Sequence, residues 1–210
     1  CNIVKDLSLD FDIEKHLNIV KKDLEDGASK DYAASRGEYL NGLILADYLG
    51  FKFVDAKDVI VFNVDGSLDT YATHEALSDK LSKVSNAVIP GFYGADKDGN
   101  IVTFSRGGSD VTGALVAESI NADLYENWTD VSGFLMADPR IIDNPKPIST
   151  ITYSELRELS YMGASVLHED SIFPVRKAGI PINIKNTNRP QDKGTFIVKD
   201  CDLSSNPNIV

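Results

Sequence analysis

Short runs rich in Val, Ile and Phe alternate with segments of helical periodicity, and this alternation restricts the possible folds more than any other feature. Apolar residues recur at the spacing of one helix face in residues 13–24, and a second helix is expected over about 32–49, with Gly50 as its C-terminal stop. Further helices are expected around 77–84 and over 111–120, 153–162 and 165–178, and strands over 51–55, 59–64, 87–93, 101–104, 123–128, 182–185 and 195–198. This order is typical of an α/β fold with a mainly parallel sheet.

An acidic stretch, Asp96-Lys97-Asp98-Gly99-Asn100, lies between two of the expected strands. A calcium-binding loop would need its glycine later and a Glu as bidentate ligand, and neither is present. We therefore expect a solvated hairpin turn here, which adds an antiparallel element to the sheet.

Composition narrows the possible functions. The 210 residues, enough for one domain or two small ones, carry 32 acidic against 21 basic residues, a net charge of −11 that disfavours binding to nucleic acid. No apolar run approaches the roughly 20 residues of a membrane span. Two distant cysteines and three His without ligand spacing predict no protein-held metal and a cytoplasmic location. Because the chain begins at Cys1 and not Met, we expect it to be a piece of a longer protein.

The strongest candidate site is the segment Ser105-Arg106-Gly107-Gly108-Ser109-Asp110, at an expected strand-to-helix turn. The paired glycines let the backbone approach a ligand closely or adopt positive φ, and Ser109 or Asp110 could cap the helix that follows. The helix N-terminus attracts anions, and the guanidinium of Arg106 suits a carboxylate. The alternative is a tight turn with a helix cap and a surface Arg.

Two further segments carry polar residues at positions suited to a ligand. Glu38, in Ser35-Arg36-Gly37-Glu38, could accept a substrate ammonium, although a solvated helix charge is the commoner role. The second segment runs from Trp128-Thr129-Asp130 to Asp138-Pro139-Arg140, beyond an expected strand end, where α/β folds gather ligands. We expect Trp128 to belong to the core, and not to stack on a ligand.

Together these segments resemble the catalytic domain of aspartate kinases, in the amino-acid kinase family. The segment 105–110 is similar to the most specific signature of those enzymes, and 35–38 to their second substrate motif. Residues 128–140 resemble their nucleotide loop, and 182–186 their closing strand. The resemblance covers nearly the whole chain.

The resemblance implies a three-layer αβα sandwich that transfers the γ-phosphate of ATP, with Mg²⁺, to the β-carboxylate of L-aspartate. It divides the chain into an aspartate-binding part, about 1–121, and a nucleotide-binding part, about 122–210. The implied catalytic residues are Asp110 and Arg106; the implied substrate-binding residues are Glu38, Phe92, Arg106, Gly107, Gly108 and Ser109. The implied nucleotide-binding residues are Thr129, Asp130, Arg140, Ser165 and Val166.

The chain departs from the family pattern in three ways. The opening strand with its Lys-Phe-Gly-Gly segment is missing, so the sandwich should be incomplete at the N-terminus. No regulatory ACT domain follows, and Ser165 stands where many members have a phosphate-binding Lys. We therefore expect residues 1–210 alone to be inactive and to form a homo-oligomer. Two alternatives stay open: a kinase for a glutamate-type acid, and a non-catalytic module that keeps the kinase fold.

Overall fold

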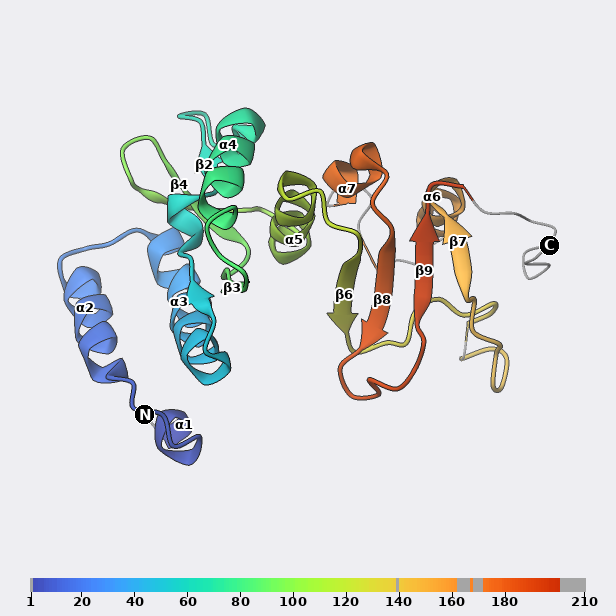
Figure 1. The fold of residues 1–210 in the computed structure, drawn as a ribbon, viewed down its shortest axis with the longest axis horizontal. Helices are drawn as coiled ribbons and strands as arrows, with labels where there is room; N and C mark the ends of the chain where they lie inside the picture. Colours follow the sequence, from blue (N-terminus) through green and yellow to red (C-terminus); the bar gives the residue numbers. More distant parts are fainter. Residues whose placement is uncertain (1, 139, 162–166, 168–171, 201–210) are drawn as a thin grey trace. The chain divides into compact units, whose positions relative to one another are not determined.

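The computed structural model describes residues 2–138, 140–161, 167 and 172–200, and it divides the chain into two compact units, 1–112 and 113–210 (Figure 1). Each unit combines helices with parallel and antiparallel strand pairs, which confirms the α/β class. Within the part of the chain that is described, no helix has both the length and the apolar character to cross a membrane.

The first unit is built around one long helix. Its helices are α1 (Asn2–Asp6), α2 (Ile13–Glu25), α3 (Lys30–Leu49), the 3₁₀ turn η1 (Ala56–Asp58) and α4 (Thr70–Leu81). The Ser29 hydroxyl accepts a hydrogen bond from Tyr32 N at the start of α3, and Gly50 ends this helix at φ +66°. The predictions of α2, α3 and the stop at Gly50 are confirmed.

The strands of the first unit are short and form two separate sheets. They are β1 (Lys52–Phe53), β2 (Val61–Phe62), β3 (Ala87–Val88), β4 (Tyr93–Asp96) and β5 (Ile101–Thr103). Strand β1 pairs with β3 in parallel, β2 pairs with β4 in parallel, and β4 and β5 form the predicted antiparallel hairpin. Asp96 Oδ1 accepts hydrogen bonds from the backbone N–H groups of Asp98 and Asn100, which closes the turn.

The prediction of one continuous strand over 87–93 is wrong. The chain leaves β3 after Val88, passes through Pro90-Gly91-Phe92, and enters β4 in a different sheet. Pro90 has no N–H to donate to a ladder, and Phe92 has a left-handed backbone at φ +60°. Both features interrupt regular strand geometry, so hydrophobic composition alone misassigned this segment.

The second unit is one mixed sheet in the order β6-β8-β9-β7. Its strands are β6 (Tyr125–Thr129), β7 (Thr150–Thr152), β8 (Ile182–Asn186) and β9 (Thr195–Val198), and its later helices are α6 (Tyr153–Tyr161) and α7 (Phe173–Ala178). Strands β6 and β8 are parallel, as are β7 and β9, whereas β8 and β9 are antiparallel. The sequence reasoning missed β7. Of the helix expected over 165–178, the described residues show α7.

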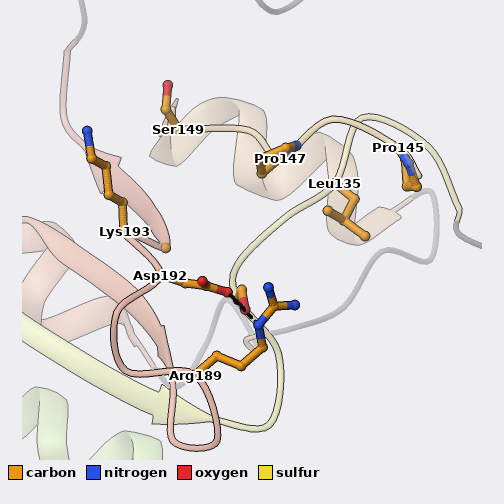
Figure 2. Close-up of a pocket in the computed structure, with 9 residues that line it drawn as sticks. Leu135, Pro145, Pro147, Ser149, Arg189, Asp192 and Lys193 are labelled. Atoms are coloured by element: carbon orange, nitrogen blue, oxygen red, sulfur yellow. Dashed lines mark hydrogen bonds and ion pairs between the residues drawn. The ribbon is translucent and has the colours of Figure 1, made fainter.

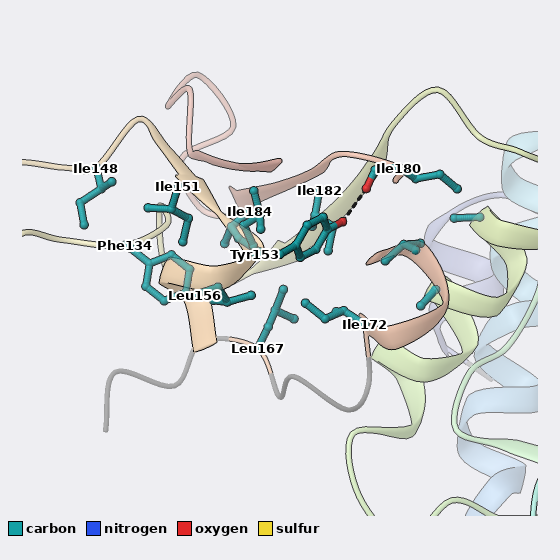
Figure 3. Close-up of a cluster of buried hydrophobic side chains, with 14 residues drawn as sticks. Phe134, Ile148, Ile151, Tyr153, Leu156, Leu167, Ile172, Ile180, Ile182 and Ile184 are labelled. Carbon is teal, nitrogen blue, oxygen red and sulfur yellow. Dashed lines mark hydrogen bonds between the residues drawn. The ribbon is translucent and has the colours of Figure 1, made fainter. Parts of the chain in front are cut away.

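An apolar core joins this sheet to its helices (Figure 3). Ile182 and Ile184 of β8 and Leu156 of α6 have no exposed surface, and the same cluster includes Val175 of α7. The hydroxyl of Tyr153 donates a 2.5 Å hydrogen bond to Ile180 O at the edge of this core. The core therefore fixes the sheet in which Thr129 and Asp130 lie at the carboxyl end of β6.

Candidate active site

The glycine-rich turn packs directly against the Pro90-Gly91-Phe92 segment. Helix α5 (Gly108–Ser119) begins at Gly108, where a Cβ would lie 2.7 Å from Phe92 Cα and 2.8 Å from Phe104 Cβ. A Cβ on Gly91 would lie 3.1 Å from Ser109 Cα. These distances leave little room for side chains, so the glycines permit two backbone segments to approach each other closely.

The residues of this turn differ in exposure and position. Gly107 has φ +57°, which confirms the expected positive φ, and Arg106 is exposed at the surface. Because α5 begins at Gly108, Ser109 and Asp110 lie inside its first turn, and the expectation that one of them caps the helix is wrong. Their backbone N–H groups therefore belong to the helix start itself, where an anion is favoured.

Phe92 is held in its left-handed conformation by hydrogen bonds from two elements. Its N–H donates to Thr112 Oγ1 at 3.2 Å, and its carbonyl accepts from Phe104 N at 2.9 Å. The Thr112 hydroxyl in turn donates to Gly108 O at 2.8 Å. A bulky residue at positive φ is strained, and such strain persists where surrounding contacts over-determine it, commonly at ligand sites. Sequence reasoning missed Thr112, because a helical threonine carries no distinct local signal.

Glu38 lies on the face of α3 that contacts the Pro90-Gly91-Phe92 segment. Four residues beyond it, a Cβ on Gly42 would lie 3.5 Å from Pro90 Cβ, and seven residues before it, Asp31 Oδ2 accepts a hydrogen bond from Thr103 N at 3.1 Å. Positions separated by seven and eleven residues share one helix face. Glu38 is half-buried between these two contacts, which favours a binding role over a fully solvated charge.

Arg36, two residues before Glu38, is buried with 7% of its surface exposed. Its Nε and Nη2 donate to Ser35 Oγ at 3.1 and 2.9 Å, and Nε also donates to Tyr32 O at 3.3 Å. The sequence reasoning gave this residue no role, because a charged residue on a helix is normally assumed to face solvent.

In the second unit, Thr129 and Asp130 lie at the carboxyl end of β6, beside the end of its parallel neighbour β8. The carbonyl of Thr129 accepts hydrogen bonds from both the backbone N–H and the hydroxyl of Thr187, at 2.8 and 3.0 Å. The Thr129 hydroxyl donates to Asp130 Oδ1 at 3.3 Å. The two predicted nucleotide-binding residues are thus joined to each other and to the loop that follows β8.

A polar network and a pocket extend this strand edge. Asn186 Nδ2 donates to Ser132 Oγ at 3.0 Å, and the Ser132 hydroxyl donates to Asp192 Oδ2 at 2.7 Å. Arg189 Nε lies 3.2 Å from the same oxygen of Asp192 (Figure 2). The pocket has a volume of about 500 Å³, within the range of roughly 300–1,000 Å³ usual for small-molecule sites. Its lining residues are Ser132, Leu135, Pro145, Pro147, Ser149, Arg189, Asp192, Lys193 and Gly194. None of these residues was predicted.

Arg140 has a different partner from the one its predicted role suggests. Among the described residues, its polar contacts are with Asp138: Nη2 lies 2.6 Å from Oδ2, and Nε lies 3.0 Å from both carboxylate oxygens. Hydrogen bonds from Arg140 lower the pKa of Asp138 to about 2. The structure therefore does not bring Arg140 into direct contact with Thr129 or Asp130. The predicted residues Ser165 and Val166 lie outside the described residues.

The expectation that Trp128 belongs to the core is wrong. It is 44% exposed, its Nε1 donates to Glu126 Oε2 at 3.2 Å, and Lys185 Nζ lies 5.4 Å from its ring centroid. The reason is the alternation of β6, whose residues 126 and 128 point away from the isoleucine-rich core face.

Within the described residues, no group of three or more His, Cys, Asp or Glu side chains is arranged to hold a metal ion. Mg²⁺ that enters with a nucleotide needs only one or two carboxylates, since the phosphates and water supply the other ligands. Asp130 is a carboxylate of the predicted nucleotide-binding part, so the donor type present there fits a magnesium–nucleotide substrate.

Comparisons with known proteins agree with this geometry. The model of the amino acid kinase family matches residues 3–186. Aspartokinase 3 of Bacillus subtilis is 40% identical over 185 residues, which cover 84% of this chain and 41% of that protein. The chain spans less than half the length of this relative.

Two crystal structures resemble the chain over most of its length. Clostridium acetobutylicum aspartate kinase superposes with a TM-score of 0.91 at 62% identity, over 94% of this chain and 46% of that one. Escherichia coli aspartokinase III, in complex with aspartate and ADP, superposes with a TM-score of 0.74 at 26% identity, over 90% of this chain and 46% of that one. On the family match over residues 3–186, this chain belongs to the amino acid kinase family.

Proposed function

We propose that the protein is an aspartate kinase, which transfers the γ-phosphate of ATP to the β-carboxylate of L-aspartate to give 4-phospho-L-aspartate and ADP. The observation that carries the proposal is the glycine turn of residues 105–110, packed against strained Phe92 and close to the Glu38 face of α3. The similarity to aspartokinases, one of which was crystallised with aspartate and ADP, supports the same substrates here.

The proposed aspartate site has opposite charges at its two ends. The Arg106 guanidinium would bind the α-carboxylate in a two-pronged contact, and Glu38 would accept hydrogen bonds from the α-ammonium. Gly107, Gly108, Ser109 and Phe92 would line the site. The close approach at Gly108 supports this arrangement, because a side chain there would occupy the space between the two segments.

The chemistry proposed for aspartate requires no general base. A β-carboxylate with pKa near 3.9 is ionised at neutral pH, so one of its oxygens can attack the γ-phosphorus as the bond to the ADP oxygen breaks. The difficulty is to bring one anion to another, which helix N–H groups, cationic side chains and Mg²⁺ overcome. Asp110, in the first turn of α5, would organise this centre, as the resemblance implies.

The proposed nucleotide site is the strand edge of the second unit. Thr129 and Asp130 would contact the nucleotide, together with Arg140, Ser165 and Val166, and Mg²⁺ would enter bound to the phosphates. We further assign the 500 Å³ pocket to part of the nucleotide. Ser132, which lines this pocket, follows Asp130 by two residues, and Leu135 and Pro147 give the pocket an apolar wall.

The test is the detection of acyl phosphate as its hydroxamate, in the full-length native protein, with ATP and aspartate, glutamate, N-acetylglutamate or carbamate. Turnover of aspartate and of none of the other acids supports the proposal. Preferred turnover of another acid would make the protein a different amino-acid kinase. ATP binding without turnover of any acid would make it a non-catalytic module.

Residues 1–210 on their own should be inactive. In-line transfer needs several positive groups around the γ-phosphate, and the basic residues among the predicted site residues are Arg106 and Arg140. Arg106 would be committed to aspartate. The same hydroxamate assay on residues 1–210 beside the full-length protein tests this, and comparable turnover would contradict it. We also propose a cytoplasmic homo-oligomer, which light scattering and cell fractionation would test.

A further inference from the structure

Arg36 is a buried charged residue with no role in the proposed chemistry. Burial of a charge is unfavourable unless other groups replace the lost water. Around Arg36 that replacement is largely aromatic: its guanidinium carbon lies 4.3 Å from the ring centroid of Tyr32, 4.7 Å from that of Tyr39 and 5.4 Å from that of Tyr93. The negative faces of aromatic rings attract a cation, and a planar guanidinium stacks on them better than an ammonium does.

Tyr93 connects this cation to a buried carboxylate. Its side chain has no exposed surface, and its hydroxyl donates to Asp55 Oδ1 at 2.8 Å. Asp55 is itself 9% exposed and also accepts from Lys57 N at 3.2 Å. Burial, followed by the negative charge of Asp55, raises the pKa of Tyr93, so this phenol stays a donor at neutral pH. One ring therefore contacts a buried cation with its face and a buried anion with its hydroxyl.

The two ends of this cluster lie next to proposed substrate residues. Arg36 precedes Glu38 by two positions in α3, and Tyr93 directly follows Phe92, whose ring centroid lies 6.1 Å from that of Tyr93. A buried, directional contact between Arg36 and Tyr93 therefore sets the position of α3 relative to the start of β4. That spacing determines the distance between Glu38 and the Phe92–Gly108 contact.

We propose that Arg36 and Tyr93 are positioning residues for the acidic substrate, which hold Glu38 and Phe92 at the separation that binds an amino acid of aspartate's length. The inference rests on the proposed function, since Glu38 and Phe92 matter only if they bind the substrate. Neither positioning residue touches the substrate or the nucleotide in this account. Their loss should therefore weaken aspartate binding and leave ATP binding unchanged.

The expected effects differ between substitutions. Arg36→Met removes the charge that the three tyrosine rings surround, and with it the cation–ring contact to Tyr93, so the KM for aspartate should rise roughly tenfold or more. Arg36→Lys keeps a cation near the rings but loses the guanidinium contacts to Ser35, so it should rescue most of this loss, leaving roughly a threefold rise. Tyr93→Phe keeps the ring and removes the hydroxyl, and a rise of roughly fivefold is expected.

The experiment measures KM for aspartate, KM for ATP and kcat in the full-length native protein, with calorimetric titration of aspartate and a melting curve for each variant. Tyr48→Phe is the matched control for Tyr93→Phe, because it removes the same hydroxyl from Tyr48 of α3, which is 56% exposed. Lys21→Met is the control for charge removal, since the Lys21 side chain is 73% exposed. Both controls should keep the unsubstituted constants.

The inference is supported if the KM for aspartate rises while the KM for ATP stays constant, and if Arg36→Met raises it more than Arg36→Lys does. Unchanged aspartate constants in folded variants, or equal rises for both substrates, would overturn it and leave the cluster a purely structural one. If Arg36→Met does not fold, Arg36→Lys and Tyr93→Phe decide the question by the same criterion. Failure of the unsubstituted protein to bind aspartate would overturn the proposed function itself, and this inference with it.

Discussion

Both units bury aliphatic side chains, but among the described residues the buried charged ones, Arg36 and Asp55, lie in the first unit. The first unit buries Arg36, Asp55 and Tyr93 in a network of hydrogen bonds and ring contacts, next to strands of two to four residues. The second unit buries an aliphatic cluster in which isoleucine predominates, against a four-stranded sheet. Polar networks depend on direction, whereas aliphatic packing depends on volume. Substitutions in the first unit should therefore disturb ligand geometry, and those in the second should mainly reduce stability.

The largest effect on stability is expected from Leu156→Ala in α6. Leu156 has no exposed surface and packs in the aliphatic cluster, so its truncation should lower the free energy of unfolding by roughly 2–5 kcal/mol. Urea denaturation followed by the fluorescence of Trp128, the single tryptophan of the sequence, reports this unit directly. Leu124→Ala is the control, because Leu124 is 37% exposed and should lose less than 1 kcal/mol or so. Equal losses in the two variants would contradict an aliphatic core centred on Leu156.

The next effect is on catalysis. Arg106→Ala should lower kcat/KM for aspartate by roughly 10- to 150-fold, because it removes a charged hydrogen bond to the substrate. The KM for ATP and the melting temperature should stay near their original values, since Arg106 is exposed. Lys97→Ala, in the hairpin turn, provides a charge-matched control within the same unit. Unchanged aspartate kinetics in Arg106→Ala would remove Arg106 from the proposed site.

A smaller effect is expected for Arg140→Ala. The phosphates of ATP would have to compete with Asp138 for the guanidinium, so the expected loss is only several-fold, and it should fall on ATP more than on aspartate. Calorimetric titration of both ligands gives the ranking. A greater loss of aspartate affinity would refute the assignment of Arg140 to the nucleotide.

The smallest expected effect is on the stability of the fold at alkaline pH. Burial, with a hydrogen bond to Asp23, raises the pKa of Tyr32 to about 12, and burial raises the pKa of Tyr153 to about 12; the pKa of Tyr39 and that of Tyr93 are raised as well. A raised folded-state pKa means that the unfolded chain loses its proton first. The contribution of these tyrosines to the free energy of unfolding is thus complete below pH 10, the ordinary tyrosine pKa. It is lost as the pH rises from 10 to 12 and above.

Three of these four tyrosines belong to the first unit, so its structure should be lost at lower pH than that of the second. Circular dichroism compared with Trp128 fluorescence between pH 8 and 12 measures the difference. Tyr48→Phe removes an exposed phenol and should leave the pH profile unchanged. Simultaneous loss of both signals would indicate that the buried tyrosines do not set the alkaline limit.

Local signals in the sequence predicted much of the architecture. Apolar periodicity located α2, and Gly50 marked the end of α3 because only a residue tolerant of positive φ suits that position. The acidic stretch around Gly99 predicted the β4–β5 turn, and the Gly107-Gly108 pair indicated a position that allows positive φ, which Gly107 adopts at +57°. Each of these features depends on neighbours within a few residues.

Other features depended on contacts between distant segments, and sequence reasoning missed them. The burial of Arg36 requires Tyr93, 57 positions further along the chain, and the network at Ser132 requires Asp192. The exposure of Trp128 depends on which face of β6 meets the helices, and a strand's own pattern does not say which face that is.

The sequence by itself therefore determined the α/β class, the ends of the main helices and the turn proposed to bind the acidic substrate, because these follow from backbone preferences and hydrophobic period. Tertiary structure alone decided that Arg36 is buried, that the chain between Val88 and Tyr93 changes sheets, and that Ser132 bonds to Asp192. The physical reason is that the free energy of a charged or aromatic side chain depends on which groups replace its water. Those groups are set by the packing of segments far apart in the chain.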